Sequence, residues 1–134
     1  MTNLQQLCKQ ILALNKAIRF VGIERMDGRI ASIQYREGII PFLTREESEL
    51  SFMQALIRMN TRRTMEHKIG RPLFSITEYE QVIRSTVMVY DGSNRFQLGS
   101  EFLLFLSFEK KTANPMWIIK EKILPFVEQM VRSA

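Results

Sequence analysis

The dipeptide Asp27-Gly28 is the strongest constraint that the sequence places on the fold. It lies between two β-rich runs in IRFVGIERMDGRIASIQYR, of which the second ends near Arg36. Asp-Gly supplies the positive backbone φ angles that a tight hairpin turn needs. The pattern therefore predicts two neighbouring antiparallel strands, and any fold of this chain has to contain an antiparallel sheet.

An amphipathic helix is predicted before the hairpin, over residues 3–17. Its apolar residues recur every three or four positions, and Thr2 or Asn3 can cap its start. Cys8, the one cysteine of the chain, lies on the apolar stripe, which favours a buried hydrophobe over a reactive thiol. Gln and Lys interrupt the segment and no small-residue cleavage site follows, so we expect no secretory signal and a cytoplasmic protein.

A second and longer helix is predicted over residues 45–69. Thr44 and Glu47 have the spacing of a capping box, and Gly70 followed by Pro72 supplies the stop. Apolar residues are dense in the first half of this segment and sparse in the second half. We therefore expect the helix to leave the core as it proceeds.

Three further strands are predicted within residues 72–81, 82–92 and 101–111. The first alternates imperfectly between polar and apolar residues, as a strand at a sheet edge or in an interface does. The other two are apolar on both faces, as central strands are. The connection 91–100 is rich in turn residues, and whether it also extends a strand is open from the sequence alone.

A last helix is predicted to open at Asn114-Pro115, an N-cap followed by proline at the first helical position. Pro125 lies inside it and predicts a kink near Glu121. The full order of elements is helix, strand, strand, helix, three strands, helix. Residues 1–134 are thus predicted to form one α+β domain, with a five-stranded antiparallel sheet flanked by three helices.

The net charge of +5 comes mostly from residues 58–72, and the rest of the chain is close to neutral. Arg62 and Glu66 stand four residues apart and are expected to pair. Three interpretations of this basic cluster stay open: a solvated helix end, a surface that meets acidic groups of a protein, or a nucleic-acid site. The last has the least support, because no stacking surface, zinc finger or recognition helix accompanies the charge.

The sequence contains no pattern typical of an enzyme. A Gly-rich phosphate loop and a Gly-x-Ser-x-Gly elbow are both absent, and one histidine with one cysteine cannot form a usual zinc set. Glu78 and Glu80 share a strand face, but surface carboxylates are a commoner role than an acid–base pair. We therefore expect a non-enzymatic protein with no catalytic residue, metal or cofactor. The longest apolar run is also far too short to span a membrane.

The element order, with RMDGRIAS at 25–32 and FLSFEKKTANP at 105–115, resembles the roadblock family of dynein light chains and their stand-alone prokaryotic relatives. This family belongs to the profilin-like, longin-related group. The resemblance implies a homodimer that acts as a scaffold or regulator of a small GTPase. It also implies an interface made by the second helix and the following strand, at Phe52, Leu56, Met59, Arg62, Arg63, Leu73, Ser75, Thr77 and Tyr79.

Partner identity is the least constrained expectation. The resemblance implies a second copy of the chain and, beyond it, a small GTPase or another acidic protein surface. A small-molecule-sensing domain of the PAS or GAF type and a nucleic-acid-binding domain remain as alternatives. The long helix and the patchy strand both look incomplete in a monomer, which favours protein interaction.

Overall fold

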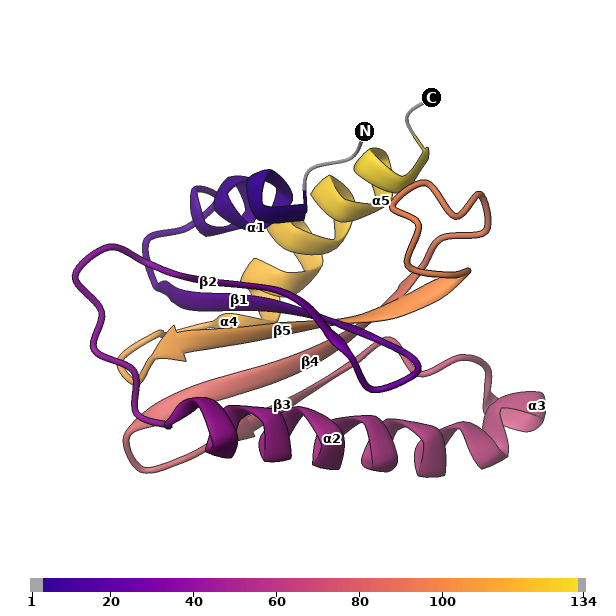
Figure 1. The fold of residues 1–134 in the computed structure, drawn as a ribbon, viewed down its shortest axis with the longest axis horizontal. Coiled ribbons are helices and arrows are strands. Elements are labelled where there is room, and N and C mark those ends of the chain that lie inside the picture. The colour runs from indigo at the N-terminus through magenta and orange to yellow at the C-terminus, as the bar shows by residue number, and fades with distance from the viewer. Residues whose placement is uncertain (1–3, 133–134) are drawn as a thin grey trace.

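The computed structural model describes residues 4–132 and has three layers (Figure 1). A five-stranded antiparallel sheet in the order β2-β1-β5-β4-β3 lies in the middle. Helices α1 and α5 cover one face and helix α2 covers the other. The strands are β1 (Ile18–Arg25), β2 (Ile30–Tyr35), β3 (Phe74–Glu78), β4 (Val82–Tyr90) and β5 (Glu101–Glu109); the helical segments are α1 (Leu4–Leu12), α2 (Arg45–Arg62), η1 (Arg63–Met65), α3 (Glu66–Ile69), α4 (Pro115–Ile118), η2 (Ile119–Ile123) and α5 (Leu124–Arg132).

The predicted fold class and element order are confirmed, with differences at the ends of helices. Helix α1 ends at Leu12 rather than at residue 17, because turns occupy the residues before β1. The proposed caps Thr2 and Asn3 lie outside the described residues. Within the described part of the chain, no helix is long and apolar enough to cross a membrane.

The predicted hairpin joins β1 to β2. The Gly28 N–H donates to the Arg25 carbonyl at 3.0 Å, and the Arg25 N–H donates to the Arg29 carbonyl at 2.8 Å. Gly28 has a φ of +91°, whereas Asp27 does not enter the positive region. Asp27 instead accepts a hydrogen bond from the Arg29 N–H at 3.1 Å. The turn thus needs one left-handed residue, not two, and an Asx contact supports the rest.

Helix α2 begins at the predicted capping box. The Glu47 N–H donates to Thr44 Oγ1 at 3.1 Å, and the Thr44 N–H donates to Glu47 Oε1 at 2.9 Å. The single helix predicted over 45–69 is wrong in its second half, because the 3₁₀ segment η1 separates α2 from the short α3. Gly70, with a φ of +89°, ends α3 as expected.

Two separate apolar cores lie on the two faces of the sheet. The larger one packs α1, α4, η2 and α5 against the sheet and contains Cys8, which is fully buried as predicted. Burial raises the pKa of the Cys8 thiol. The smaller core lies under α2, where the Phe52 ring stacks on Phe105 with centroids 4.0 Å apart. The α2 layer therefore rests on far fewer buried residues than the opposite layer.

The connection between β4 and β5 is a loop that contributes to the larger core. Phe96 and Leu98 are buried there and do not extend a strand. The buried Asp91 carboxylate accepts from the Phe96 N–H at 3.2 Å and from Ser93 Oγ at 3.0 Å. The loop is therefore ordered around one buried acid, which satisfies backbone that a strand would have paired.

The last helix is interrupted near the predicted position. Asn114 Oδ1 accepts from the Trp117 N–H at 3.1 Å, so the predicted cap is confirmed. The π-helical segment η2 contains Glu121, the residue whose carbonyl Pro125 cannot satisfy. A wider turn accommodates the missing donor, as π-bulges in helices do.

Candidate functional site

Helix α2 and strand β3 form the surface that the roadblock resemblance implies as an interface. The structure places the predicted helix residues Phe52, Leu56 and Met59 in the smaller core, exposed by 1%, 6% and 1%. They hold α2 on the sheet of their own chain and present almost no area to a partner. The exposed apolar side chains of α2 are instead Leu50, Met53 and Ile57, three or four residues apart along an outer side of the helix.

The predicted residues of the strand segment, Leu73, Ser75, Thr77 and Tyr79, alternate with Phe74 and Ile76, which pack on the larger core. Ser75, Thr77 and Tyr79 line a groove that α2 borders. Leu73 and Tyr79 at its ends are about half exposed. Ser75, Thr77 and Tyr79 therefore lie on the α2 side of the sheet, and the alternation of the strand gives Leu73 the same side.

Strand β3 is an edge strand, and within residues 4–132 it pairs only with β4. The Leu73 carbonyl accepts from the Met88 N–H at 2.9 Å, and the Tyr79 N–H donates to the Val82 carbonyl at 2.8 Å. In an antiparallel pair, successive residues of a strand point their N–H and C=O groups alternately toward the partner strand and away from it. Leu73 and Tyr79 point theirs toward β4. Ile76 is three residues from each and therefore points its backbone groups away from β4. This edge can accept another strand.

The basic residues of the α2 end have different roles. Arg63 is partly buried and pairs within its own chain: it forms ion pairs with Glu101 at 2.5 Å and with Glu66 at 3.0 Å. These hydrogen bonds, the Glu101 bond first, raise the pKa of the Arg63 guanidinium. The predicted Arg62–Glu66 pair is therefore wrong, because Arg63 takes that glutamate where η1 breaks the helix. Arg62 is exposed.

The groove between α2 and β3 is basic and narrow. Arg58, Arg62 and Arg84 line it together with serine and threonine hydroxyls, and Arg84 donates to Ser51 Oγ at 2.8 Å. The volume of the groove is about 30 Å³, close to that of one water molecule, so no organic ligand fits inside. A charged surface of this kind suits contact with acidic groups of a protein.

A second hollow, which the sequence did not predict, lies at the N-terminal end of α2. It measures about 300 Å³, and five of its lining side chains are aromatic: Phe20, Tyr35, Phe42, Phe52 and Tyr79. These rings come from β1, β2, the β2–α2 loop, α2 and the end of β3. No local motif links such distant positions, and their gathering depends on the strand register.

The described residues bring together no constellation with obvious catalytic geometry. The histidine His67 is exposed on α3, whereas Cys8 is buried in the core on the other face of the sheet. Glu78 forms an ion pair with Lys110 at 2.5 Å. Among residues 4–132, no cluster of three or more His, Cys, Asp and Glu side chains could hold a metal ion.

Comparisons with known proteins give the fold. No family model matches the chain, and no curated protein sequence matches it. Solved structures match over nearly its whole length. An MglB structure with a tetrameric arrangement has a TM-score of 0.69 at 12% identity, over 95% of this chain and 84% of that one. MglB of Myxococcus xanthus has 0.68 at 12%, over 98% and 94%.

A third similar structure is a Roadblock/LC7 domain. The Roadblock/LC7 domain from Streptomyces avermitilis has a TM-score of 0.62 at 11% identity, over 97% of this chain and 92% of that one. At sequence identities this low, structural similarity shows the fold alone. The order of helices and strands that the sequence predicted is present in the described residues. The chain therefore folds as a roadblock-like domain.

Proposed function

We propose that this chain is a non-enzymatic protein-interaction module that works as a homodimer through α2 and β3. One observation carries the proposal: β3 is an edge strand, and among the described residues no strand pairs with its outer edge. The side of α2 that borders β3 carries Ser51, Ala55, Arg58 and Arg62. A second copy can pair with the strand edge and contact this side of α2 at the same time. The exposed Leu50 and Ile57 lie on another side of the helix.

The charges of α2 are self-complementary for an antiparallel helix pair. Glu47 lies in the acidic first turn, and Arg62 lies in the last turn. A two-fold axis between Gln54 and Ala55 brings Glu47 opposite the partner's Arg62 and Ser51 opposite the partner's Arg58, because these positions are equally distant from the axis. An antiparallel arrangement also sets opposite ends of the two helix dipoles side by side.

The same axis suits the strand edge. Ala55 lines the groove with Ser75 and Thr77, the two neighbours of Ile76. A β3–β3 pair centred on Ile76 therefore lies next to the centre of the helix pair. In that pairing the backbone of Ile76 exchanges hydrogen bonds with its own copy, and a sheet of five strands becomes one of ten.

Light scattering after size exclusion tests the dimer. The wild type is expected at twice the chain mass of 15.8 kDa at tens of micromolar. Replacing Arg58 and Arg62 together by Glu is expected to give the monomer mass. The negative charge at position 62 of each chain then faces Glu47 of the other chain, which makes two like-charged pairs in the dimer. Lys9→Glu with Lys120→Glu, exposed on the opposite layer, is the matched control and is expected to stay dimeric.

A wild type at the monomer mass would refute the dimer. Equal dissociation by both charge-reversal pairs would refute its location on α2 and β3.

We further propose that the dimer serves as a scaffold or regulator of a small GTPase, as the roadblock resemblance implies. The exposed Lys68 and Arg71 after the break in the helix remain available for an acidic surface. Affinity capture from the cell extract, with a GTP analogue or GDP added, tests this step. We expect mass spectrometry to identify a P-loop GTPase retained in one nucleotide state and lost with Lys68→Glu. Its absence from both nucleotide states would contradict the proposal.

A further inference from the structure

The aromatic hollow at the start of α2 has a floor made by one row of residues across four strands. Phe20 of β1 is paired with Tyr35 of β2 and with Ser107 of β5, and Ser107 is paired with Arg84 of β4. The first turns of α2 and the β2–α2 loop complete the walls. The cavity is therefore bounded by the sheet on one side and by a loop on the other.

A β-bulge aims an arginine at this cavity. The pairing of β1 with β5 shifts between Ile18 and Phe20, so Arg19 is the extra residue. Ile18 is consequently buried in the larger core, whereas Phe20 belongs to the smaller one. Both Arg19 and Phe20 line the cavity. Bulges often re-aim a side chain beside a binding site.

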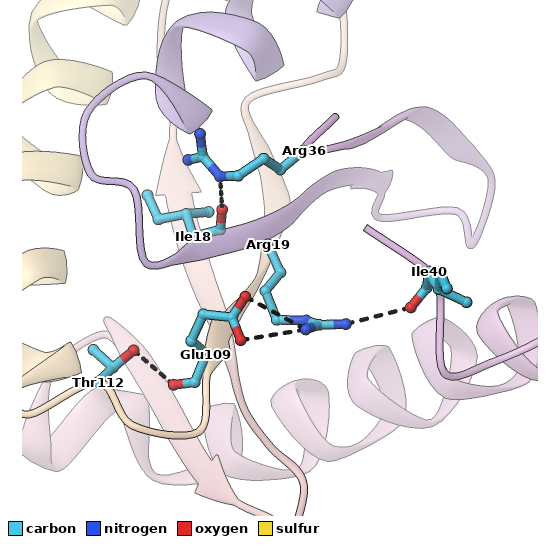
Figure 2. Close-up of polar contacts among 6 residues, drawn as sticks. All are labelled: Ile18, Arg19, Arg36, Ile40, Glu109 and Thr112. Atoms are coloured by element: carbon cyan, nitrogen blue, oxygen red, sulfur yellow. Dashed lines mark hydrogen bonds and ion pairs between the residues drawn. The ribbon is translucent and has the colours of Figure 1, made fainter. Parts of the chain in front are cut away.

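Among the residues that the structure describes, Arg19 makes only long polar contacts (Figure 2). Its guanidinium lies 3.4 Å from Glu109 Oε2 and 3.4 Å from the Ile40 carbonyl of the β2–α2 loop. The Phe42 ring lies against it, with its centroid 4.7 Å from the Arg19 Cζ. The Arg19 side chain is only 13% exposed, whereas that of Glu109 is 48% exposed. A nearly buried guanidinium without a short, bidentate carboxylate partner has capacity for another acceptor.

The electrostatics of the cavity favour an anion. Arg19 and Arg84 are the charged side chains among its described lining residues, and both are positive. Glu109, the only acid that contacts Arg19 in the described chain, approaches from outside the lining. The remaining surface is mostly aromatic and apolar. A ligand that matches this surface has an apolar, flat body and a single negative charge.

We propose that this cavity binds a small aromatic carboxylate, with the ring between Phe20, Phe52 and Phe42 and the carboxylate on Arg19. The volume of about 300 Å³ lies at the lower end of small-molecule sites and is about twice that of a cavity that holds benzene. One ring with a carboxylate therefore fits. The proposal does not rest on the dimer, because none of these contacts needs a second copy.

Benzoate is the probe, and isothermal titration with thermal unfolding of the full chain are the measurements. Benzoate is expected to bind and to raise the Tm, while benzamide, which has the same ring without the charge, is expected to bind about tenfold more weakly. Arg19→Gln is expected to weaken benzoate binding by about tenfold. Arg29→Gln, on the exposed hairpin tip, is the matched control and is expected to leave binding unchanged.

A second variant keeps the test valid if Arg19→Gln is unstable. Ser107→Leu fills the cavity floor without changing charge and is expected to abolish benzoate binding; the Tm of each variant without ligand shows that it is folded. The proposal is overturned by no benzoate binding at tens of millimolar, by equal affinity for benzamide, or by equal effects of Arg19→Gln and Arg29→Gln.

Discussion

Glu24 provides a sharp test of how the α2 layer is built. This side chain lies on β1, opposite Leu103 of the smaller core, and is 0% exposed. Neither carboxylate oxygen has a hydrogen-bond partner among the described residues. Burial, with a smaller contribution from the charge of Asp27, raises the pKa of Glu24 from 4.5 to about 8. At neutral pH the folded protein therefore holds Glu24 protonated.

The sign of the pH dependence follows from the raised pKa. Between pH 4.5 and 8 the folded state binds a proton that the unfolded state has lost, so stability falls as the pH rises through this window. A difference of one pH unit between the two pKa values corresponds to about 1.4 kcal/mol. From pH 6 to pH 9 this group alone is expected to remove about 2 to 3 kcal/mol of unfolding free energy.

Glu24→Gln removes the titration and keeps the size of the side chain. Urea unfolding of the wild type and the variant at pH 6 and pH 9 measures the effect, and the variant is expected to lose about 2 to 3 kcal/mol less between the two conditions. Glu128→Gln, at an exposed position of α5, is the matched control and is expected to keep the wild-type dependence. Parallel pH profiles for the wild type and Glu24→Gln would refute the reasoning.

Two further predictions concern single side chains and are checked by urea unfolding. Arg36 donates to the carbonyls of Ile18 at 2.7 Å, Leu12 at 2.5 Å and Asn15 at 2.9 Å (Figure 2 shows the first). Arg36→Met leaves these carbonyls without their donor and is expected to cost about 2 to 4 kcal/mol of unfolding free energy. A loss of unfolding free energy below experimental error would contradict this. A Cβ on Gly22 would lie 2.8 Å from Phe52 Cζ, so Gly22→Ala is expected to cost about 1 to 3 kcal/mol of unfolding free energy. Gly92→Ala, which has open space around it, is the control and is expected to be neutral within about 0.5 kcal/mol. Equal effects of the two substitutions would exclude a steric cause.

Local signals in the sequence predicted local structure well. The capping box at Thr44, the cap at Asn114 and the turn at Gly28 each depend on residues within four positions of one another. Their chemistry is complete inside one segment, and tertiary contacts did not override it. The order of these elements was enough to predict the fold class.

Contacts between distant segments were not predictable in the same way. Apolar residues occur around most of α2, so periodicity alone could not tell the buried Phe52 from the exposed Ile57. The Glu101 partner of Arg63 was not predictable for a similar reason, since it lies 38 residues away on β5. The benzoate-sized cavity depends on strand register and on one bulge, neither of which the residue pattern specifies.

The two faces of the sheet differ in how completely they are covered, and both proposed binding surfaces lie on the less covered face. On the α1 and α5 face, two helices and the loop with Phe96 close a continuous core. On the α2 face a single long helix leaves a basic groove and an aromatic cavity. It also covers the buried carboxyl group of Glu24, whose oxygens have no hydrogen-bond partner among the described residues. Burial of a second chain or a ligand on the α2 face still removes apolar area from water. On the other face the helical layer exposes Met116 and Trp117 by about half. Binding on the α2 layer is therefore expected to stabilise the whole domain, because the weaker of its two cores is the one that gains contacts.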